Sequence, residues 1–598
     1  MKKVAIFGGG MAGLAVAHEL VHRGFTVDVY ESAAVVGGKS ASQDVSGLPA
    51  PTPGPYGPRR AFLGEHGFRF FPGFYFNVIA TMSEIPRPAA HGGGVVADDL
   101  VESPQAAMAY PALNGVDRFY PFDRKAALPS WDVYGRLRAL LDGLGFTTVD
   151  LARMAWFRLK YLSAGPSRRL QWDDTSWHDF IELDSPHYSP GFRDFETSIP
   201  RTMSAMAAKT TSAMIVGNIG MQFGLGYARP GNREDRLLVG PTNYRWLQPW
   251  YDYLASRAVP VSFHTQHELV SLTYVKNSQT ISGAVVQPLG GASFKVAADY
   301  YVAALPLDVV QKKITADMAN DDPQLAKLQG INSTTATSWM AGAQFFLKRD
   351  VPMVGGHVFY PQTPWALTSV SQAQFWNQNQ SKHSVADSYG DGTVKGVISA
   401  IISDWTKPSD VTGKAAQDYK ESEIPKLLDE VRRQMRDSLP GQFDLSSANI
   451  AGQHLDDAIQ LVNATRPVPS NNTRLLVHPL NGYMERPLAQ GTIDNLFLAG
   501  DYVRTSTGLA TMESANEAAR MAVNALLAAD GGAYLPCPIW TLQEDAFFAP
   551  VKQMDELRLA RGLPHVLDSC PIRFLKDAGL IDWAQELFKV PAAILLPG

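Results

Sequence analysis

Residues 4–31 decide the fold, and they read VAIFGGGMAGLAVAHELVHRGFTVDVYE. Val4 to Phe7 is a short, continuously apolar run, as expected for a strand buried on both faces of a parallel sheet. Ala12 to Arg23 predicts a helix that Gly24 ends, and Thr26 to Tyr30 predicts a second strand. Together these segments predict a complete β-α-β unit.

Three glycines, Gly8, Gly10 and Gly13, span the junction of the predicted strand and the predicted helix. The first allows a tight turn, the second lets a pyrophosphate approach the backbone, and the third lets the helix pack on the strand. The start of the helix offers N–H groups and partial positive charge to phosphates. Glu31 ends the second strand, where its carboxylate can accept both hydroxyls of a ribose. The pattern favours a dinucleotide site over a glycine-rich turn beside a surface glutamate.

The next glycines distinguish FAD from NAD. Gly37-Gly38-Lys39 follows Glu31 closely. A Gly-Gly pair there lets the chain pass close to the pyrophosphate, and the basic residue can reach a phosphate or the ribityl chain. This extension is typical of FAD-binding members of the fold, so the sequence favours FAD.

A second half of the site is predicted near the C-terminus, in NLFLAGDYVRTSTGLATMESANEAAR at 495–520. An apolar strand ends in Gly500-Asp501, and a loop leads to a helix that opens near Met512. Asp501 can accept a hydrogen bond from a ribityl hydroxyl. The start of the helix can stabilise negative charge on the edge of a reduced flavin. One more strand-loop-helix unit without a ligand is the alternative.

With both motifs in view, the chain resembles the flavin amine oxidase and carotenoid desaturase superfamily. It is most similar to plant and cyanobacterial phytoene desaturases and their bacterial relatives. Four stretches carry the resemblance: residues 4–42, GEHGFRFFPGFYFN at 64–77, the strand region 261–305, and residues 475–527.

The resemblance implies a set of cofactor-binding residues. Gly67 is expected close to the isoalloxazine, and the backbone of Val270 is expected to contact the adenine. Asp501 and Met512 are expected near the ribityl chain and the flavin O2 edge. The full set is Gly8, Gly10, Met11, Ala12, Gly13, Glu31, Gly37, Gly38, Lys39, Gly67, Val270, Gly500, Asp501 and Met512.

The sequence departs from both groups of relatives. Residues 471–499 contain no cysteine at the place where amine oxidases usually link their flavin, so we expect non-covalent FAD. Gly500-Asp501 replaces the Gly-Glu common in amine oxidases, which favours the desaturase side. Arg69 stands where plant-type desaturases often carry histidine. A buried cation is costly unless a polar or anionic group pairs with it. Arg69 therefore favours a lipid substrate that bears a polar group over a pure hydrocarbon.

Arg69 and Tyr483 are the candidate catalytic residues. A salt-bridged structural arginine is the alternative for Arg69, and a structural role is the alternative for Tyr483, Glu485 and Arg504 beside the C-terminal motif. The Met-rich stretch 203–226 and the aromatic segments at 119–161 are candidates for the wall of a substrate cavity, with plain core as the alternative. The histidines show no cluster that predicts a proton relay, and no metal site is predicted.

The composition limits the class of protein. The chain has 598 residues and a net charge of -5, so nucleic acid is not an expected partner. Two cysteines, Cys537 and Cys570, allow one disulfide at most. We therefore expect the protein to reside in the reducing cytoplasm. The sequence contains no apolar run of about 18 residues, so no membrane span is predicted, while peripheral membrane contact stays open. The oligomeric state also stays open.

The fold class that follows is α/β. It is a Rossmann-type FAD-binding domain, discontinuous in sequence, with an inserted mixed α+β substrate domain of the amine oxidase and desaturase type. Residues 90–235 are expected to be helical and aromatic, and a long charged helix is expected near 415–437. The predicted boundaries assign 1–88, 236–305 and 466–530 to the FAD domain, 89–235 and 306–465 to the substrate domain, and 531–598 to a C-terminal extension.

Four functions compete. The first is an FAD-dependent desaturase or dehydrogenase of an isoprenoid or other apolar small molecule, by hydride transfer to flavin N5. The second is a redox-neutral, flavin-dependent isomerase of polyene bonds. The third is an amine or amino-acid oxidase. The fourth is a non-enzymatic escort protein for prenylated GTPases, which intact flavin motifs disfavour.

Overall fold

A parallel five-stranded sheet assembles from three distant parts of the chain. The computed structural model describes residues 1–124, 143–228, 235–378 and 383–569. The sheet has the order β12-β2-β1-β16-β26, and every neighbouring pair is parallel. Its strands are β1 (Lys3–Phe7), β2 (Thr26–Glu31), β12 (Ser262–Thr265), β16 (Tyr300–Ala303) and β26 (Leu496–Leu498). The discontinuous Rossmann-type architecture is therefore confirmed.

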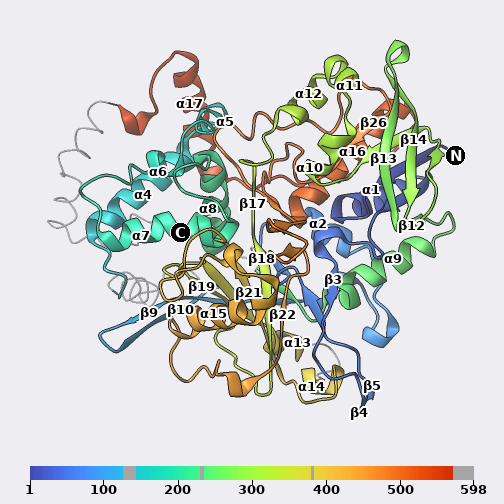
Figure 1. Ribbon diagram of the computed structural model, residues 1–598. Coiled ribbons are helices and arrows are strands. Elements are labelled where there is room, and N and C mark those ends of the chain that lie inside the picture. Colours follow the sequence, from blue (N-terminus) through green and yellow to red (C-terminus); the bar gives the residue numbers. More distant parts are fainter. Residues whose placement is uncertain (125–142, 229–234, 379–382, 570–598) are drawn as a thin grey trace.

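Two helices lie side by side against this sheet. They are α1 (Met11–Val21) and α16 (Met512–Asp530), which carry the two glycine-containing motifs at their starts. Their packing encloses a buried ion pair, in which Arg520 Nη1 lies 2.8 Å from Glu19 Oε1. A second sheet of three strands flanks the first: β13 (His267–Val275), β14 (Thr280–Pro288) and β15 (Phe294–Val296). Figure 1 shows β13 and β14 beside β12 and α1.

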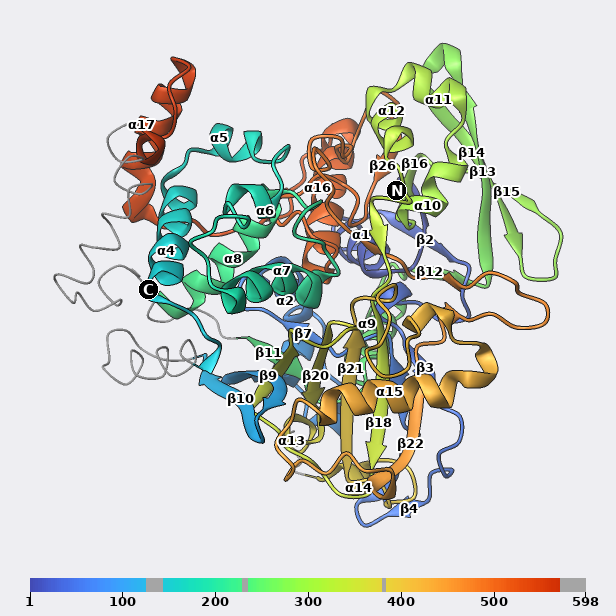
Figure 2. The ribbon, with the colours of Figure 1, turned by 60° about the vertical axis from the view of Figure 1, so that its left-hand side comes forward.

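The substrate side is built on a seven-stranded sheet with the order β10-β9-β19-β20-β21-β18-β22. Helix α15 (Ile424–Arg436) lies across it, as Figure 2 shows. The apolar face of α15 has Leu427, Leu428, Val431 and Met435 at helical spacing, and all four are buried against the sheet. The strands are β9 (Gln105–Leu113), β10 (Val116–Asp123), β18 (Ala341–Leu347), β19 (Gly356–Tyr360), β20 (Leu367–Ser371), β21 (Gly396–Ile402) and β22 (Ile450–Leu455).

A helical region forms the third part of the molecule, at the upper left of Figures 1 and 2. Its core is an aromatic cluster that includes Phe157, Phe180 and Phe192. The later helix α17 (Ala549–Ala560) packs on α4 (Thr148–Ser163) and α5 (Pro166–Gln171), where Asp555 pairs with Arg168 at 2.8 Å. The region comprises α4 (Thr148–Ser163), α5 (Pro166–Gln171), α6 (Trp177–Phe180), α7 (Pro190–Ser204) and α8 (Ala213–Ala228).

The remaining elements are short. The helices are α2 (Asn77–Met82), α9 (Gln248–Ala255), α10 (Leu307–Val310), α11 (Ala316–Asp321), α12 (Pro323–Gly330), α13 (Ala373–Trp376) and α14 (Val385–Ser388). The strands are β3 (Ser42–Asp44), β4 (Pro53–Gly54), β5 (Gly57–Pro58), β6 (Leu63–Glu65), β7 (Phe70–Phe71), β8 (Leu100–Glu102), β11 (Arg236–Leu238), β17 (Thr337–Ser338), β23 (Ile459–Gln460), β24 (Ser470–Asn471) and β25 (Leu475–Leu476).

The expectation that residues 90–235 are helical is wrong at their start. Residues 105–123 form the hairpin β9–β10, which joins the edge of the seven-stranded sheet. Gln105–Leu113 contains four alanines, which favour helices, but pairing with β10 and β19 decides its structure. The missed signal is Asn114-Gly115 at the turn, where φ is 52° and 76°. Asn-Gly is the preferred pair for such a two-residue hairpin turn.

Two smaller expectations are also corrected or limited. The charged helix predicted near 415–437 begins only at Ile424, because residues 416–423 form short turns and Pro425 occupies the first helical turn. Cys537 is buried as a free thiol, and its possible partner Cys570 lies outside the described residues. Among the helices of the described ranges, none is long and apolar enough to cross a membrane.

Candidate functional site

The turn between β1 and α1 leaves no room for a side chain at two of its glycines, Gly8 and Gly13. A Cβ atom on Gly8 would lie 2.3 Å from the carbonyl oxygen of Ala304, and one on Gly13 would lie 1.9 Å from that of Gly8. Gly8 also has φ of 102°, which favours glycine. No side chain caps the start of α1 at Gly10, so its first turn keeps its electropositive character for a ligand. The tight strand-to-helix turn is therefore present as expected, and phosphate binding at this turn stays a prediction.

Glu31 lies where the ribose acceptor was predicted, at the end of β2. Its Oε2 accepts the N–H of Gly9 at 2.7 Å, and its Oε1 accepts the N–H of Ala33 at 2.7 Å and the hydroxyl of Ser32 at 3.2 Å. An ionised carboxylate has about four acceptor positions, so one remains for a ligand. Glu31 thus also holds the glycine turn in place.

The Gly37-Gly38-Lys39 stretch brings the two motifs together. The N–H of Gly37 donates to the carbonyl of Gly9 at 2.7 Å, and a Cβ on Gly38 would lie 3.0 Å from Cα of Gly10. Lys39 Nζ donates to the carbonyl of Arg474 at 2.6 Å and lies 3.9 Å from Asp501 Oδ2. The N-terminal and C-terminal halves of the predicted cofactor site therefore meet at Lys39 and Asp501.

The loop from Gly500 to the start of α16 is held by its own hydrogen bonds. Glu517 accepts the N–H groups of Ser506 at 2.7 Å and Thr507 at 3.1 Å. Thr511 caps the helix by accepting the N–H of Ser514 at 3.1 Å, so α16 starts at Met512, as expected. These bonds fix the loop relative to α16 without using Asp501.

Two further predicted contacts have suitable surroundings. Val270 is the extra residue of a β-bulge between Leu269 and Ser271, so its backbone has no partner residue on β14. This arrangement suits a residue whose backbone is expected to contact adenine. A Cβ on Gly67 would lie 3.1 Å from Cδ1 of Ile401 on β21, so Gly67 faces the seven-stranded sheet.

The donor set fits a flavin dinucleotide. The glycine turn excludes any Cβ at the two positions named above, the start of α1 has no side-chain cap, and Glu31 retains an acceptor position. Lys39 lies between the two halves. When bound, the phosphates would lie at the start of α1 and the ribose at Glu31.

Arg69 has a carboxylate partner. Its Nη2 lies 3.3 Å from Oε2 of Glu65, and it donates to the hydroxyl of Thr242 at 3.0 Å and to the carbonyl of Gly67 at 3.1 Å. Burial raises the pKa of Glu65, and Arg69 opposes that rise. Arg69 borders a small cavity that is also lined by Gln372 and Trp376. These contacts support the structural alternative for Arg69, and its catalytic role stays a prediction.

Tyr483 lies beside the C-terminal loop and belongs to an apolar cluster. A Cβ on Gly508 would lie 3.6 Å from the Tyr483 ring, and the Tyr483 N–H donates to Asp173 Oδ2 at 3.0 Å. Burial raises the pKa of its hydroxyl. The structure therefore places Tyr483 at the predicted site but leaves its catalytic role a prediction.

His66, which was not among the predicted site residues, directly precedes Gly67. His66 Nδ1 is paired with the buried carboxylate of Asp456, which follows β22. Burial alone would raise the pKa of Asp456, but His66 and the bonds from Gln43 and Ala458 hold that pKa below its usual value. An ionised Asp456 accepts a proton-bearing Nδ1, which leaves Nε2 of a neutral His66 as a proton acceptor. Its place beside Gly67 was the available signal.

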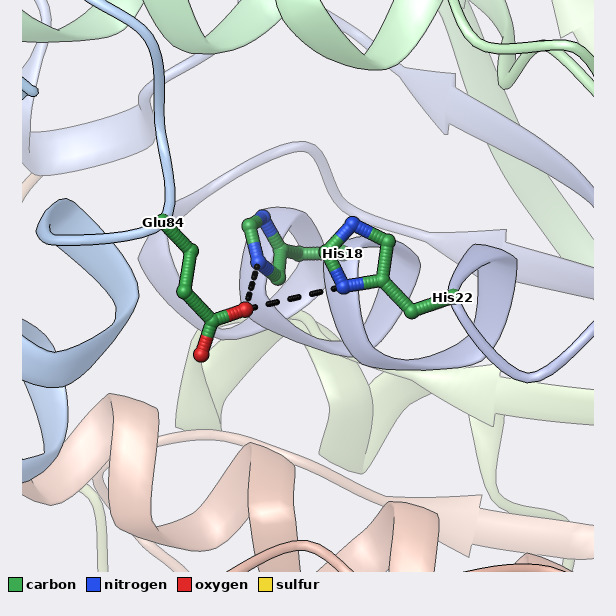
Figure 3. Close-up of side chains that lie close together, drawn as sticks. All are labelled: His18, His22 and Glu84. Atoms are coloured by element: carbon green, nitrogen blue, oxygen red, sulfur yellow. Dashed lines mark hydrogen bonds and ion pairs between the residues drawn. The ribbon is translucent and has the colours of Figure 1, made fainter.

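Figure 3 shows a second histidine group, His18, His22 and Glu84, whose ligand-type atoms lie within 4.8 Å of one another. His18 and His22 are four residues apart on α1, a spacing that places both on one face. His18 Nδ1 accepts the indole N–H of Trp250 at 3.1 Å, so the ring proton is on Nε2, which faces Glu84 Oε2 at 3.1 Å. A metal ion needs the lone pair of that nitrogen. The geometry therefore favours a hydrogen-bonded network here.

The comparisons with known proteins agree with this geometry. The probable zeta-carotene desaturase of Synechococcus elongatus is 26% identical over 338 residues, which cover 52% of this chain and 60% of the relative. The zeta-carotene desaturase of Synechocystis sp. is 26% identical over 332 residues, which cover 50% of this chain and 57% of the relative. The match spans less than two thirds of either relative.

Solved structures share the fold at low identity. An oxidoreductase from Methanosarcina mazei matches with a TM-score of 0.53 and 12% identity, over 88% of this chain and 100% of that chain. Putrescine oxidase bound to putrescine matches with a TM-score of 0.53 and 14% identity, over 89% of this chain and 98% of that chain. The model of the family of flavin containing amine oxidoreductases matches residues 11–527. The chain belongs to this family.

Proposed function

We propose that the protein binds FAD non-covalently and dehydrogenates an isoprenoid or other lipid-like substrate. The observation that carries the proposal is the meeting of Lys39 and Asp501 at 3.9 Å, next to a loop that packs on an apolar cluster. The resemblance to proteins named zeta-carotene desaturases supports the substrate class. The absence of cysteine from 471–499 supports non-covalent binding.

The apolar cluster supports a hydrocarbon-like substrate. It consists of Met206, Met214, Ile215, Ile219 and Leu509, with Tyr483 packed against it. Leu509 comes from the loop between Asp501 and α16, while Ile215 and Ile219 come from α8. A substrate that reached this cluster would meet a mainly apolar surface with a few polar groups, which is typical of small-molecule sites.

His66 is the proton acceptor that we propose. Forming one carbon–carbon double bond removes a hydride and a proton from neighbouring carbon atoms. Bound FAD would accept the hydride. His66 would take the proton at Nε2, because Asp456 holds the proton of Nδ1 and stabilises the resulting imidazolium.

The substrate class is tested by anaerobic mixing of the holoprotein with long-chain isoprenoids, fatty acids or amines. We expect the isoprenoid or another lipid to bleach the visible flavin absorbance. Bleaching by amines alone, with peroxide formed in air, would support the amine oxidase instead. Conversion without net reduction of an acceptor would support the isomerase, and a preparation that stays colourless after FAD addition would support the escort protein.

The role of His66 is tested with His66→Gln and Asp456→Asn. We expect His66→Gln to keep the bound flavin and to lower the rate of flavin bleaching by about 100-fold, the size of a lost general base. Asp456→Asn should give a smaller loss and shift the pH profile of the rate. Bleaching at the wild-type rate in His66→Gln would exclude His66 as the proton acceptor.

A further inference from the structure

Arg486 is a buried cation beside the C-terminal motif. Arg486 is only 3% exposed. Nη1 donates to the carbonyl oxygen of Asp501 at 3.3 Å, and Nη2 lies 2.9 Å from Nδ1 of His478. Both contacts are to neutral groups, because burial, together with the charge of Arg486, lowers the pKa of His478 well below its usual value.

This environment sets Arg486 apart from the other buried arginines of the described residues. Six of these have a carboxylate oxygen 2.6 to 2.8 Å from a guanidinium nitrogen, whereas Arg486 has no carboxylate of the described residues within the 4.0 Å limit of an ion pair. The six pairs are Arg87–Asp99, Arg153–Glu182, Arg168–Asp555, Arg169–Glu544, Arg432–Asp429 and Arg520–Glu19. Buried charges are normally paired, so the exception needs a physical reason.

The two carboxylates whose charge acts on Arg486 belong to Asp501 and Asp173, and each has one oxygen engaged with another group. Within the described residues, the other oxygen of Asp173 is buried without a hydrogen-bond partner. Asp501 and Asp173 raise the pKa of Arg486 by their charge, against a larger lowering by burial, which leaves that pKa at about 10. Oδ2 of Asp501 lies 3.9 Å from Lys39 Nζ, and Oδ2 of Asp173 accepts the N–H groups of Tyr483 and Met484 at 3.0 and 3.3 Å. Neither forms an ion pair with the guanidinium.

We propose that Arg486 is the anion-binding residue of the flavin site and that a bound ligand supplies its missing counter-charge. The inference rests on the proposed function, because the contact with Asp501 places Arg486 at the C-terminal flavin motif. The anionic group is either a flavin that has become negatively charged, by reduction or by addition of an anion, or a carboxylate carried by the substrate. A guanidinium suits both, since it keeps its charge and offers five donors.

The experiment compares wild type with Arg486→Gln and Arg486→Lys. The first arm titrates the oxidised holoprotein with sulfite, which adds to flavin and leaves negative charge on it. The second arm measures binding of dodecanoate and of dodecanol, which differ in the anionic group. Arg436→Gln removes the same charge at an exposed position of α15 and serves as the control. Flavin content and the unfolding temperature of the flavin-free protein are measured for every variant.

We expect Arg486→Gln to lower the affinity for either sulfite or dodecanoate by about tenfold or more. This is the effect of losing a charge-assisted hydrogen bond. Weaker sulfite binding identifies the flavin as the source, and weaker dodecanoate binding with unchanged dodecanol binding identifies the substrate. Arg486→Lys should recover part of the affinity. The unfolding temperature of the flavin-free protein should stay the same or rise, because no carboxylate loses a partner.

Unchanged sulfite and dodecanoate binding in Arg486→Gln would overturn the inference. If wild type retains no flavin at all, the proposed function fails, and the dodecanoate arm alone decides the role of Arg486. A loss equal to that of Arg436→Gln in the deciding arm would also overturn it, because it would reflect net charge and not the buried site.

Discussion

The ammonium group of Lys39 lies 3.9 Å from the carboxylate of Asp501, although the two residues belong to motifs at opposite ends of the sequence. Both side chains are partly exposed, at 31% and 20%. The contact follows from the order of the parallel sheet, where β1 is next to β16 and β16 is next to β26. In parallel sheets, ligands bind beyond the carboxyl ends of the strands, and this pair marks that place.

The pair should matter for the cofactor more than for folding. In a double-mutant cycle with Lys39→Met and Asp501→Asn, we expect a coupling below about 1 kcal/mol in the stability of the flavin-free protein, as for exposed ion pairs. Each single variant should lower the affinity for FAD by about tenfold, because it loses a predicted polar contact to the ligand. Urea unfolding and FAD titration measure the two quantities. A coupling of several kcal/mol in stability would mean that the pair is structural.

Glu31→Ala should weaken FAD binding strongly. Removing the carboxylate leaves the N–H of Gly9 without its acceptor at 2.7 Å and removes the predicted ribose contact. Lost hydrogen bonds to a charged group are worth about 1.5–3 kcal/mol, or about 10- to 150-fold in affinity. Glu31→Gln keeps one acceptor oxygen, so its affinity for FAD should lie between those of wild type and Glu31→Ala. Wild-type flavin occupancy in Glu31→Ala would place the ribose elsewhere.

Arg520→Met should destabilise the packing of α1 against α16. The substitution leaves Glu19 buried without its partner at 2.8 Å, although Arg23 still lies 2.7 Å from the other oxygen. We expect a loss of about 3 kcal/mol in the free energy of unfolding, the lower end for a broken buried pair. Glu19→Met combined with Arg520→Met should restore much of it. Urea denaturation monitored by circular dichroism tests this, and a loss below about 1 kcal/mol would contradict it.

The sequence predicted those parts of the site that depend on local backbone geometry. At Gly8 and Gly13 no Cβ fits against the neighbouring backbone, and Gly37 and Gly38 have positive φ of 122° and 55°. Both requirements are visible as glycines in the sequence. Glu31 was predictable for a related reason, since its place at the end of β2 follows from the length of one β-α-β unit. The same reasoning missed the hairpin β9–β10 because its composition favours a helix.

The polar residues could not be ranked from the sequence. Arg69 and Arg486 are both buried cations near the flavin motifs, yet only the folded chain shows that Glu65 faces the first and that no carboxylate within 4.0 Å faces the second among the described residues. The distinguishing property of Arg486 is a missing partner, which no local pattern records. His66 directly follows β6 and Asp456 directly follows β22. Their pairing also arises only from tertiary packing, so the sequence could not reveal it.

His357 should make the protein less stable in mild acid. Its ring packs against Phe68, Phe70 and Phe359, and its buried Nε2 has no hydrogen-bond partner in the part of the chain that the structure describes. Burial, and secondarily the charge of Arg124, lowers its pKa from 6.5 to about 3. Between these two values the unfolded chain binds a proton that the folded protein does not bind. Stability is therefore complete above the unfolded value and is lost as the pH falls below it.

At pH 5.5, about one unit below the unfolded value, His357 alone should account for about 1.4 kcal/mol of lost stability. His357→Phe and His357→Gln should both reduce the difference in unfolding free energy between pH 8 and pH 5.5 by this amount. Comparing the two pH values cancels the change in packing, which differs between phenylalanine and glutamine. Urea unfolding at both pH values gives the measurement. If both variants keep the wild-type difference, His357 is charged in the folded protein or is not a source of the acid sensitivity.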